Sequence, residues 1–222
     1  MAEATIPKRT RQKLSRDLVL RAALRLADED GIEAVSMRRL GQALHVEAMS
    51  LYKHVAGKED ILDGIADLVM DEVEIPDRDL PWRAALRQSA ISTYEALLRH
   101  PWAGPVLESR RNPGPRRTAY LDAVVSILLG AGFTLPDVAR AFMAVDSHVY
   151  GFALTVLAWP FDLRDAPEEA AIMADETFGS AFPGLRAMAE LAVVGPGVPV
   201  EIEFGLDLIL DGLERRLAQP TG

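Results

Sequence analysis

The chain has 222 residues with 24 Lys and Arg, 33 Asp and Glu and a net charge of −9, a length that fits one or two domains. Hydrophobic residues make up 49% of the chain, which excludes a mainly disordered protein. The chain contains no cysteine, which excludes disulfides, thiolate zinc sites, iron–sulfur clusters and cysteine nucleophiles.

The N-terminal part has the pattern of four helices. They are expected at about residues 15–29, 37–44, 47–54 and 58–73. Ser15 and Ser36 are suited to cap the first two, and Gly31 fits the position just past the end of the first. A break at 45–46 separates the second helix from the third, and Gly57 marks the turn before the fourth.

The remaining chain is also predicted to be helical after a proline-containing linker at 75–81. Further helices are expected at about residues 82–98, 118–130, 135–159, 169–178 and 200–217. Thr134, Pro136 and Asp137 give a strong start signal for the longest of them. Residues 100–116, rich in Pro and Gly, are expected to be irregular or broken helix.

Strand signals are nearly absent. Residues 161–168 are expected to form a loop, and the extended-looking stretch 193–200 is also interpreted as a loop because of its Gly-Pro-Gly. The pattern therefore predicts an all-α protein with one domain over residues 1–75 and a larger helical domain over 76–222.

The sequence shows no export or membrane signal. The stretch Met1–Lys13 is polar and basic and lacks the apolar core of a signal peptide. The most apolar run, Ala123–Leu135, has 13 residues, fewer than the roughly 20 needed to span a bilayer. We therefore expect a soluble, cytoplasmic protein with no membrane partner.

Positive charge is concentrated at the N-terminal end of the chain. Residues 1–58 hold 11 Lys and Arg against 7 Asp and Glu, and residues 59–222 hold 13 against 26. This uneven charge suggests that only residues 1–58 contact a polyanion such as DNA. A basic N-terminal tail without such a role would give a similar count.

Residues 35–55 have the pattern of two short helices on either side of a tight turn. Their candidate core residues are Met37, Leu40, Leu44, Val46, Leu51 and Val55. The second helix presents a mixture of small, hydrogen-bonding and basic side chains, namely Ala48, Met49, Ser50, Tyr52, Lys53 and His54. This mixture suits entry into the major groove of DNA. Ser36 and Arg38 can meet the DNA backbone from the start of the preceding helix.

The run LYKHVAGKED at residues 51–60 and the surrounding residues 19–62 resemble the TetR family of one-component transcriptional regulators. Residues 141–152 and 204–214 resemble its tetracycline-repressor branch. The resemblance implies a three-helix DNA-binding domain, with a helix-turn-helix at about 36–55, followed by an effector-binding and dimerisation domain. It also implies double-stranded operator DNA, a small-molecule effector and a second copy of the chain as partners, with no cofactor.

The resemblance also implies roles for individual residues. Phosphate contacts are expected from Ser36, Arg38, Tyr52, His54 and Lys58, and base contacts from Ala48, Met49, Ser50 and Lys53, with Met37 included in the DNA-binding set. The chain departs from the family at His45, where glycine is usual, but histidine tolerates positive φ better than most residues. Glu47 replaces the commoner Ser or Thr cap, and an acidic group at a helix start is acceptable.

The resemblance implies that the effector binds in the helical body after residue 82. Candidate lining residues are Trp102, Leu107, Arg110, Phe142, Asp146 and Tyr150, although the aromatic ones also fit an ordinary core. Asp146 lies in an apolar helix and must be paired, neutral or directed to a wet cavity. Tetracycline repressors carry a metal-binding histidine in this region, and Leu107 takes its place here. We therefore predict neither a magnesium–tetracycline site nor any other metal site.

The last helix is apolar on more than one side, so it is either a central core helix or part of a dimer interface. The resemblance favours a four-helix interface between two copies. The interface residues predicted on the two helices concerned are Val149, Phe152, Val156, Ile202, Leu206, Ile209 and Leu213.

Three functions follow from these observations. The first, which we predict, is a ligand-responsive repressor that binds a palindromic operator as a homodimer and is not an enzyme. The second is an all-helical enzyme with Asp146 or His148 as base, which no motif in the sequence supports. The third is a constitutive interaction protein that has no effector.

Overall fold

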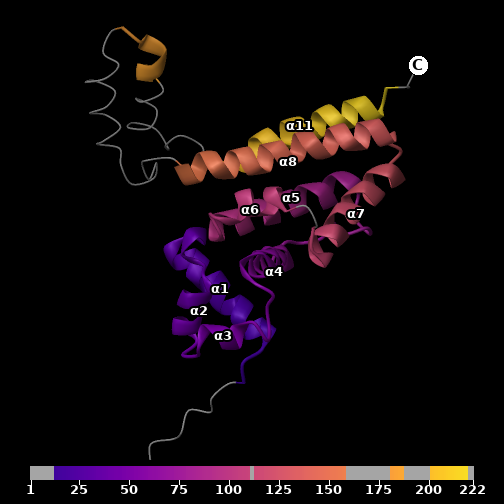
Figure 1. Cartoon of the computed structure of the whole chain (residues 1–222). Helices are drawn as coiled ribbons and strands as arrows, with labels where there is room; N and C mark the ends of the chain where they lie inside the picture. The colour runs from indigo at the N-terminus through magenta and orange to yellow at the C-terminus, as the bar shows by residue number, and fades with distance from the viewer. Residues whose placement is uncertain (1–12, 111–112, 159–180, 188–200, 220–222) are drawn as a thin grey trace, which may run out of the picture. The chain divides into compact units, whose positions relative to one another are not determined.

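The computed structural model describes residues 13–110, 113–158, 181–187 and 201–219. Within these ranges the regular structure is helical and no strand occurs, which confirms the predicted all-α class. The chain divides into two compact units (Figure 1). The first unit comprises residues 1–72 and 99–119, and the second comprises 73–98 and 120–222. The functional boundary near residue 75 remains a prediction.

The first unit contains the helices expected before the linker and one more. Its elements are α1 (Arg16–Asp30), the 3₁₀ turn η1 (Ile32–Ala34), α2 (Met37–Ala43), α3 (Ala48–Leu51), α4 (Lys58–Asp71) and α6 (Ala103–Ser109). The predicted cap of α1 is confirmed, because Ser15 Oγ accepts the N–H of Leu18 at 3.2 Å. Gly31 ends this helix with φ 82°, a left-handed conformation that favours glycine.

A small apolar core holds the first unit together. Helix α1 packs on α2 and α4, α2 packs on α3, and α4 packs on α6. The fully buried side chains at these contacts include Val19, Val35, Leu40, Leu51, Ile61 and Ile65. The spacing of these residues leaves the opposite helix faces open to solvent.

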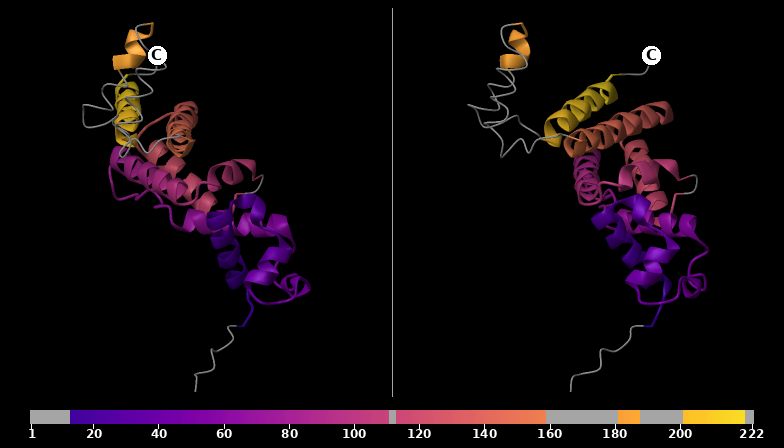
Figure 2. Two further views of the ribbon diagram at one scale, coloured as in Figure 1. Left: turned by 90° about the vertical axis from the view of Figure 1, so that its left-hand side faces the viewer. Right: turned by 60° about the vertical axis from the view of Figure 1, so that its left-hand side comes forward.

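The second unit contains most of α5 (Trp82–Arg99), the later part of α7 (Pro115–Gly130), α8 (Leu135–Ala158) and α11 (Ile202–Leu217). Helices α8 and α11 lie side by side (Figures 1 and 2). They approach closely at Gly205, where a Cβ would lie 2.4 Å from Cε1 of His148. His148 Nε2 also lies 3.0 Å from the carbonyl oxygen of Ile202. A larger residue at position 205 would therefore displace the His148 ring from its place between the two helices.

The expectations for the later chain concern the start of α7, the stretch 100–116 and three elements after residue 160. Helix α7 begins at Pro115 rather than near residue 118, because proline is well suited to the first helical position. The proline-rich stretch 100–116 contains the short helix α6 within it. The elements expected at 161–168, 169–178 and 193–200 lie outside the described residues.

Helix α8 is apolar enough to cross a membrane by length and composition alone, with a mean hydropathy of 1.4 in its most apolar window. The sequence analysis did not single it out for this property. In the structure α8 packs on α11, and its buried side chains include Val145, Val149 and Ala153, as expected of a helix in a helical domain.

The start of α8 is joined to the end of α11 by a network around Asp137. Asp137 Oδ1 accepts from Nε of Arg216 at 2.8 Å and from Nη1 of Arg140 at 2.9 Å. Thr134 Oγ1 donates to Oδ2 of Asp137 at 2.8 Å and accepts the N–H of Asp137, so the predicted cap is confirmed. The hydrogen bond from Arg216, together with those from Thr134 and Arg140, lowers the pKa of Asp137 to about 2.

This network predicts a stability change in acid. The pKa of Asp137 is about 2 in the fold and 3.8 as its ordinary value, so its contribution is complete above pH 3.8 and disappears as the pH falls toward 2. Asp137→Asn should therefore destabilise the protein at pH 7 and reduce the dependence of stability on pH between 4 and 2. Urea denaturation followed by circular dichroism at several pH values measures both effects.

The control for this experiment is Asp79→Asn, at an exposed position in the 73–81 segment. It should keep the pH dependence of the unaltered protein. An Asp137→Asn protein with the unaltered slope between pH 4 and 2 would contradict the assignment.

Candidate nucleic-acid interface and effector region

The tight turn between α2 and α3 depends on two residues. His45 has φ 54°, so the predicted left-handed conformation is confirmed. Gly41 lies against the turn, where a Cβ would be 2.9 Å from the carbonyl oxygen of Val46 and 3.2 Å from the amide nitrogen of Ala48. Both neighbours are backbone atoms, so any side chain at position 41 would force the helices apart. The sequence analysis missed Gly41, although a glycine within a short helix was the available signal.

Helix α3 is shorter than the expected 47–54, since it ends at Leu51 and residues 52–54 form a turn. The N–H groups of Lys53 and His54 donate to the carbonyl oxygens three residues earlier, at 3.4 and 2.8 Å. This spacing gives a turn narrower than that of an α-helix. This turn brings Val55 into the core beside Leu51. Glu47 takes the N-cap position of α3 without a side-chain cap bond.

The outer face of α3 and of the turn after it presents two of the four predicted base-reading side chains, Met49 and Lys53, together with Tyr52, a predicted phosphate contact. Met49 is 75% exposed, and Tyr52, directly after the helix, is 50% exposed. Lys53 is also exposed, whereas Ala48, Ser50 and His54 are partly buried. Met49, Tyr52 and Lys53 thus lie on the solvent side, whereas Leu40, Leu51 and Val55 of the predicted core set are buried.

Three of the five predicted phosphate-contacting residues, Ser36, Arg38 and Lys58, lie at the starts of α2 and α4, and the other two, Tyr52 and His54, lie in the turn after α3. Ser36 Oγ accepts the N–H of Arg39 at 3.3 Å, which confirms it as the cap and leaves its hydroxyl hydrogen able to donate. Arg38 is exposed and Met37 is partly buried. Lys58 Nζ lies 3.9 Å from Oε2 of the exposed Glu33, a pairing that an incoming phosphate can displace.

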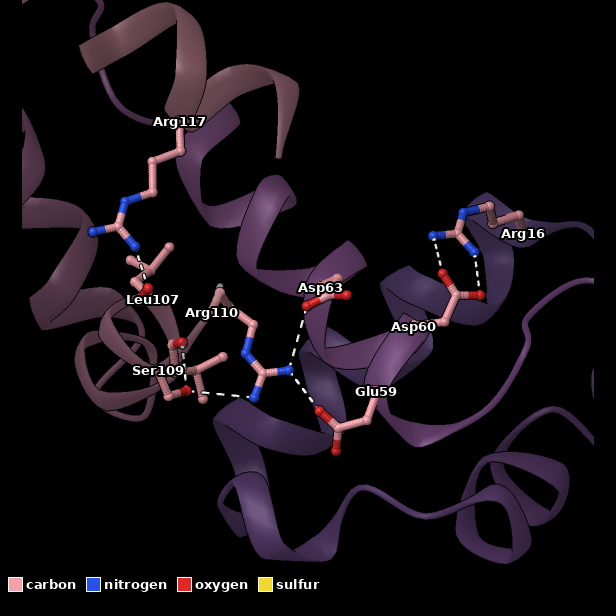
Figure 3. Close-up of polar contacts among 9 residues, drawn as sticks. Arg16, Glu59, Asp60, Asp63, Leu107, Ser109, Arg110 and Arg117 are labelled. Carbon is pink, nitrogen blue, oxygen red and sulfur yellow. Dashed lines mark hydrogen bonds and ion pairs between the residues drawn. The ribbon is translucent and has the colours of Figure 1, made fainter. Parts of the chain in front are cut away.

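Ion pairs from α1 hold this region in place (Figure 3). Arg16 donates to both carboxylate oxygens of Asp60, each at 2.7 Å, and Asp60 also accepts the N–H of Ala56 at 2.7 Å. The hydrogen bonds from Arg16 are the main cause that lowers the pKa of Asp60. Arg39 of α2 pairs with Asp30 at the end of α1. The sequence analysis missed these pairs, whose partners are distant in the chain.

Three of the predicted effector-binding residues belong to the first unit. Trp102 is buried, and its Nε1–H donates to Oδ1 of Asp28 in α1 at 2.7 Å. Leu107 is buried in α6 and has no metal-binding atom in its side chain. Arg110 donates to Oε2 of Glu59 at 2.7 Å and to Oδ1 of Asp63 at 3.3 Å (Figure 3). These bonds raise the pKa of Arg110, mainly through Glu59.

The other three, Phe142, Asp146 and Tyr150, lie on α8 in the second unit and are partly buried. The six residues therefore fall in two compact units, and their shared role in binding an effector stays a prediction. Leu107 and Arg110 border a space of about 10 Å³ in the first unit, which is water-sized. Within the described residues, no group of three His, Cys, Asp or Glu side chains is placed to hold a metal ion.

The predicted dimer residues divide into two groups. Val149, Ile202 and Leu206 are buried within a single chain, so they cannot lose further exposed area to a second copy. The apolar pattern of a helix does not reveal which side its own chain covers, so the sequence could not separate these residues from exposed ones. Partly buried positions are Phe152, Val156, Ile209 and Leu213.

Large apolar side chains remain uncovered on other faces of α8 and α11. Phe204 is 71% exposed and Leu208, one turn later on α11, is 56% exposed. Met143 and Leu154 are similarly exposed on one side of α8. Such neighbouring apolar positions on paired helices mark an interaction surface.

Comparisons with known proteins agree with this arrangement. Residues 19–65 match the family model described as bacterial regulatory proteins of the tetR family, and residues 75–217 match the tetracyclin repressor-like C-terminal domain. The chain is 34% identical to the HTH-type transcriptional repressor DrrR1 of Streptomyces coeruleorubidus, over 94% of this chain and 80% of that protein.

Two solved structures are also similar. A possible TetR family transcriptional regulator from Streptomyces coelicolor A3(2) has a TM-score of 0.74 and 30% identity, over 91% of this chain and all of that one. A TetR variant from Acinetobacter baumannii AYE in complex with minocycline has a TM-score of 0.69 and 28% identity, over 95% and 98% of the two chains.

Proposed function

The chain belongs to the TetR family of transcriptional regulators, and on this basis we propose that it is a repressor that binds a palindromic operator as a homodimer and is released by a small-molecule effector. Its relatives are transcriptional regulators rather than enzymes, which removes the helical-enzyme alternative. Because operators lie on DNA in the bacterial cytoplasm, we assign the protein to that compartment.

The observation that carries this proposal is the two-sided α3. Leu51 anchors the helix in the core, while Met49 and Tyr52 face solvent. A short helix anchored in this way can enter the major groove with its outer face toward the base edges. Arg38, Lys53 and Lys58 supply positive charge around it for the phosphates.

Dimer formation follows from the limited reach of one such helix. One copy reads few base pairs, whereas a twofold pair reads two half-sites about 34–36 Å apart. The exposed apolar side chains of α8 and α11, led by Phe204 and Leu208, provide a surface for the second copy. We therefore place the interface on these side chains and on Phe152, Val156, Ile209 and Leu213, and remove the three buried residues from it.

Release by an effector requires a connection between the effector region and α3. Helix α6 belongs to the same compact unit as the reading helices, and Arg110 binds two acidic residues one turn apart on α4. An effector that moves α6 would therefore move α4 and, through Asp60, the loop after α3. It need only bind one arrangement of these helices more tightly than the other.

Selection of bound duplexes from a random DNA pool tests the proposal. A palindromic consensus with half-sites one helical turn apart is expected. Enrichment of no sequence, or of a single unrepeated half-site, would contradict the dimeric repressor. An effector screen on the selected duplex then distinguishes a releasable repressor from a constitutive binding protein.

Removing one positive charge near α3 should weaken operator binding and reduce its salt dependence. Lys58→Gln should lower the slope of log affinity against log salt by about 0.9, the value expected for one lost phosphate contact, and Lys53→Gln should lower it as well. Fluorescence anisotropy of the selected duplex over a range of salt concentrations measures the slope. Arg215→Gln, at an exposed position on α11 of the second unit, should leave it unchanged.

A further inference from the structure

The second unit contains a hollow that none of the predicted effector residues borders. It has a volume of about 430 Å³, within the range of small-molecule sites. It lies where the 73–81 segment enters α5 and where α7 ends. The residues relevant to its chemistry are Arg78, Leu80, Trp82, Ser126, Ile127 and Ala131.

The walls of this hollow offer a fixed aromatic surface. The ring of Trp82 packs edge-to-face against Phe133, with centroids 5.2 Å apart and planes at 82°. This contact restrains the indole, so a ligand ring stacking on it would not have to order it first. Leu80, Ile127 and Ala131 add apolar surface around it.

Arg78 brings a guanidinium group to the hollow, where it is paired with the carboxylate of Asp122. Its Nη2 donates to Oδ2 of Asp122 at 2.9 Å, which is the one hydrogen bond of this guanidinium among the described residues. A guanidinium has five N–H donors, so most of its donors remain available to a ligand carboxylate. The hydroxyl of Ser126, one turn after Asp122 on α7, adds a neutral donor to the lining.

The helix ends beside the hollow also favour an anion. Helix α5 has 18 residues and begins at Trp82, so the positive end of its dipole is adjacent. The opposing carbonyl end of α7 is already satisfied, because the N–H groups of Ala131, Gly132 and Phe133 bond to carbonyl oxygens of that helix at 3.0–3.2 Å. The Arg78 guanidinium and the N–H groups at the start of α5 can therefore still donate to an anion, whereas the carbonyl groups at the end of α7 are already bonded.

We propose that this hollow binds a small aromatic carboxylate, with its ring against Trp82 and its carboxylate on Arg78. None of the lining residues belongs to the first unit, which contains the reading helices. The ligand would fix the 73–81 segment to the end of α7 when the hollow is occupied.

The test uses the full chain labelled with ¹⁵N and salicylate as the probe. The three tryptophans give three indole N–H signals, and Trp82→Phe identifies the one from the hollow. Salicylate should shift the Trp82 signal with a dissociation constant of about 0.1–1 mM, in keeping with its ten heavy atoms. Salicylamide, which has the same ring without the charge, should bind at least tenfold more weakly.

Arg78→Gln should weaken salicylate binding at least tenfold, because it removes a charge-assisted hydrogen bond. The Arg78 side chain is largely exposed, so the variant should keep the dispersed spectrum of a folded protein. Arg215→Gln removes an equal charge from α11, away from the hollow, and should bind as the unaltered chain does. Equal binding of salicylate and salicylamide, an unmoved Trp82 signal, or unchanged binding by Arg78→Gln would each overturn the proposal.

Discussion

Replacing Phe204 and Leu208 together by glutamate should convert the protein from a dimer to a monomer and lower its affinity for the operator by at least about 100-fold. Phe204 is 71% exposed and Leu208 56% exposed in the single chain, so the substitutions remove little packing within it. In the proposed dimer, however, they would bury four negative charges against an apolar surface, which is strongly unfavourable.

The operator affinity should fall because a monomer no longer holds two reading helices together. When one copy is bound, its partner's helix is held near the second half-site at a high effective concentration, which accounts for a factor of about 10²–10⁴. Light scattering should give the mass of one 24.2 kDa chain, and anisotropy with the selected duplex measures the affinity.

Leu129→Glu is the matched control for this experiment. Leu129 is also an exposed leucine, but it lies on α7, outside the proposed interface. The Leu129→Glu protein should remain dimeric and bind the operator normally. A Phe204→Glu, Leu208→Glu protein that stays dimeric would place the interface elsewhere.

Leu51→Ala should lower the free energy of unfolding of the first unit by about 2–5 kcal/mol, the usual cost of removing a fully buried leucine side chain. Leu51 is completely buried and is the one buried residue within α3. The cavity left by alanine would lie directly beneath the reading helix, so operator affinity should also fall. Urea denaturation measured by circular dichroism and anisotropy with the selected duplex provide the two readouts.

Met49→Ala separates stability from DNA reading. Met49 is on the same short helix but faces solvent, so its removal should change the free energy of unfolding by less than about 0.5 kcal/mol. It should nevertheless alter the base preference seen in duplex selection, because an apolar side chain contacts thymine methyl groups. If Leu51→Ala were as stable as the unaltered chain, α3 would not be anchored as described.

Local features were predicted well from the sequence. Ser15, Ser36 and Thr134 each cap a helix as expected, because a cap depends on atoms only three residues apart. The helix-turn-helix was also found, with His45 in the left-handed conformation. The end of α3 was missed because the pattern around residues 52–54 fits both a helix and a turn.

Long-range contacts could not be predicted from spacing. Arg16 and Asp60 are 44 residues apart, and Arg110 and Glu59 are 51 apart, so no periodicity connects them. The same limit affected the dimer residues. Leu206 and Phe204 are equally apolar in a pattern, and the packing of α11 on α8 determines which of them is buried.

The path of the chain between the two units limits how the regulator can be recombined with others. The chain passes from one unit to the other at 72–73, 98–99 and 119–120. A fragment ending near residue 75 would therefore lack His100, which contacts Asp28 and Glu72, and also Trp102. The N-terminal segment alone therefore lacks part of its own compact unit. We expect that a hybrid joining this segment to the body of another regulator needs residues 99–119 grafted with it.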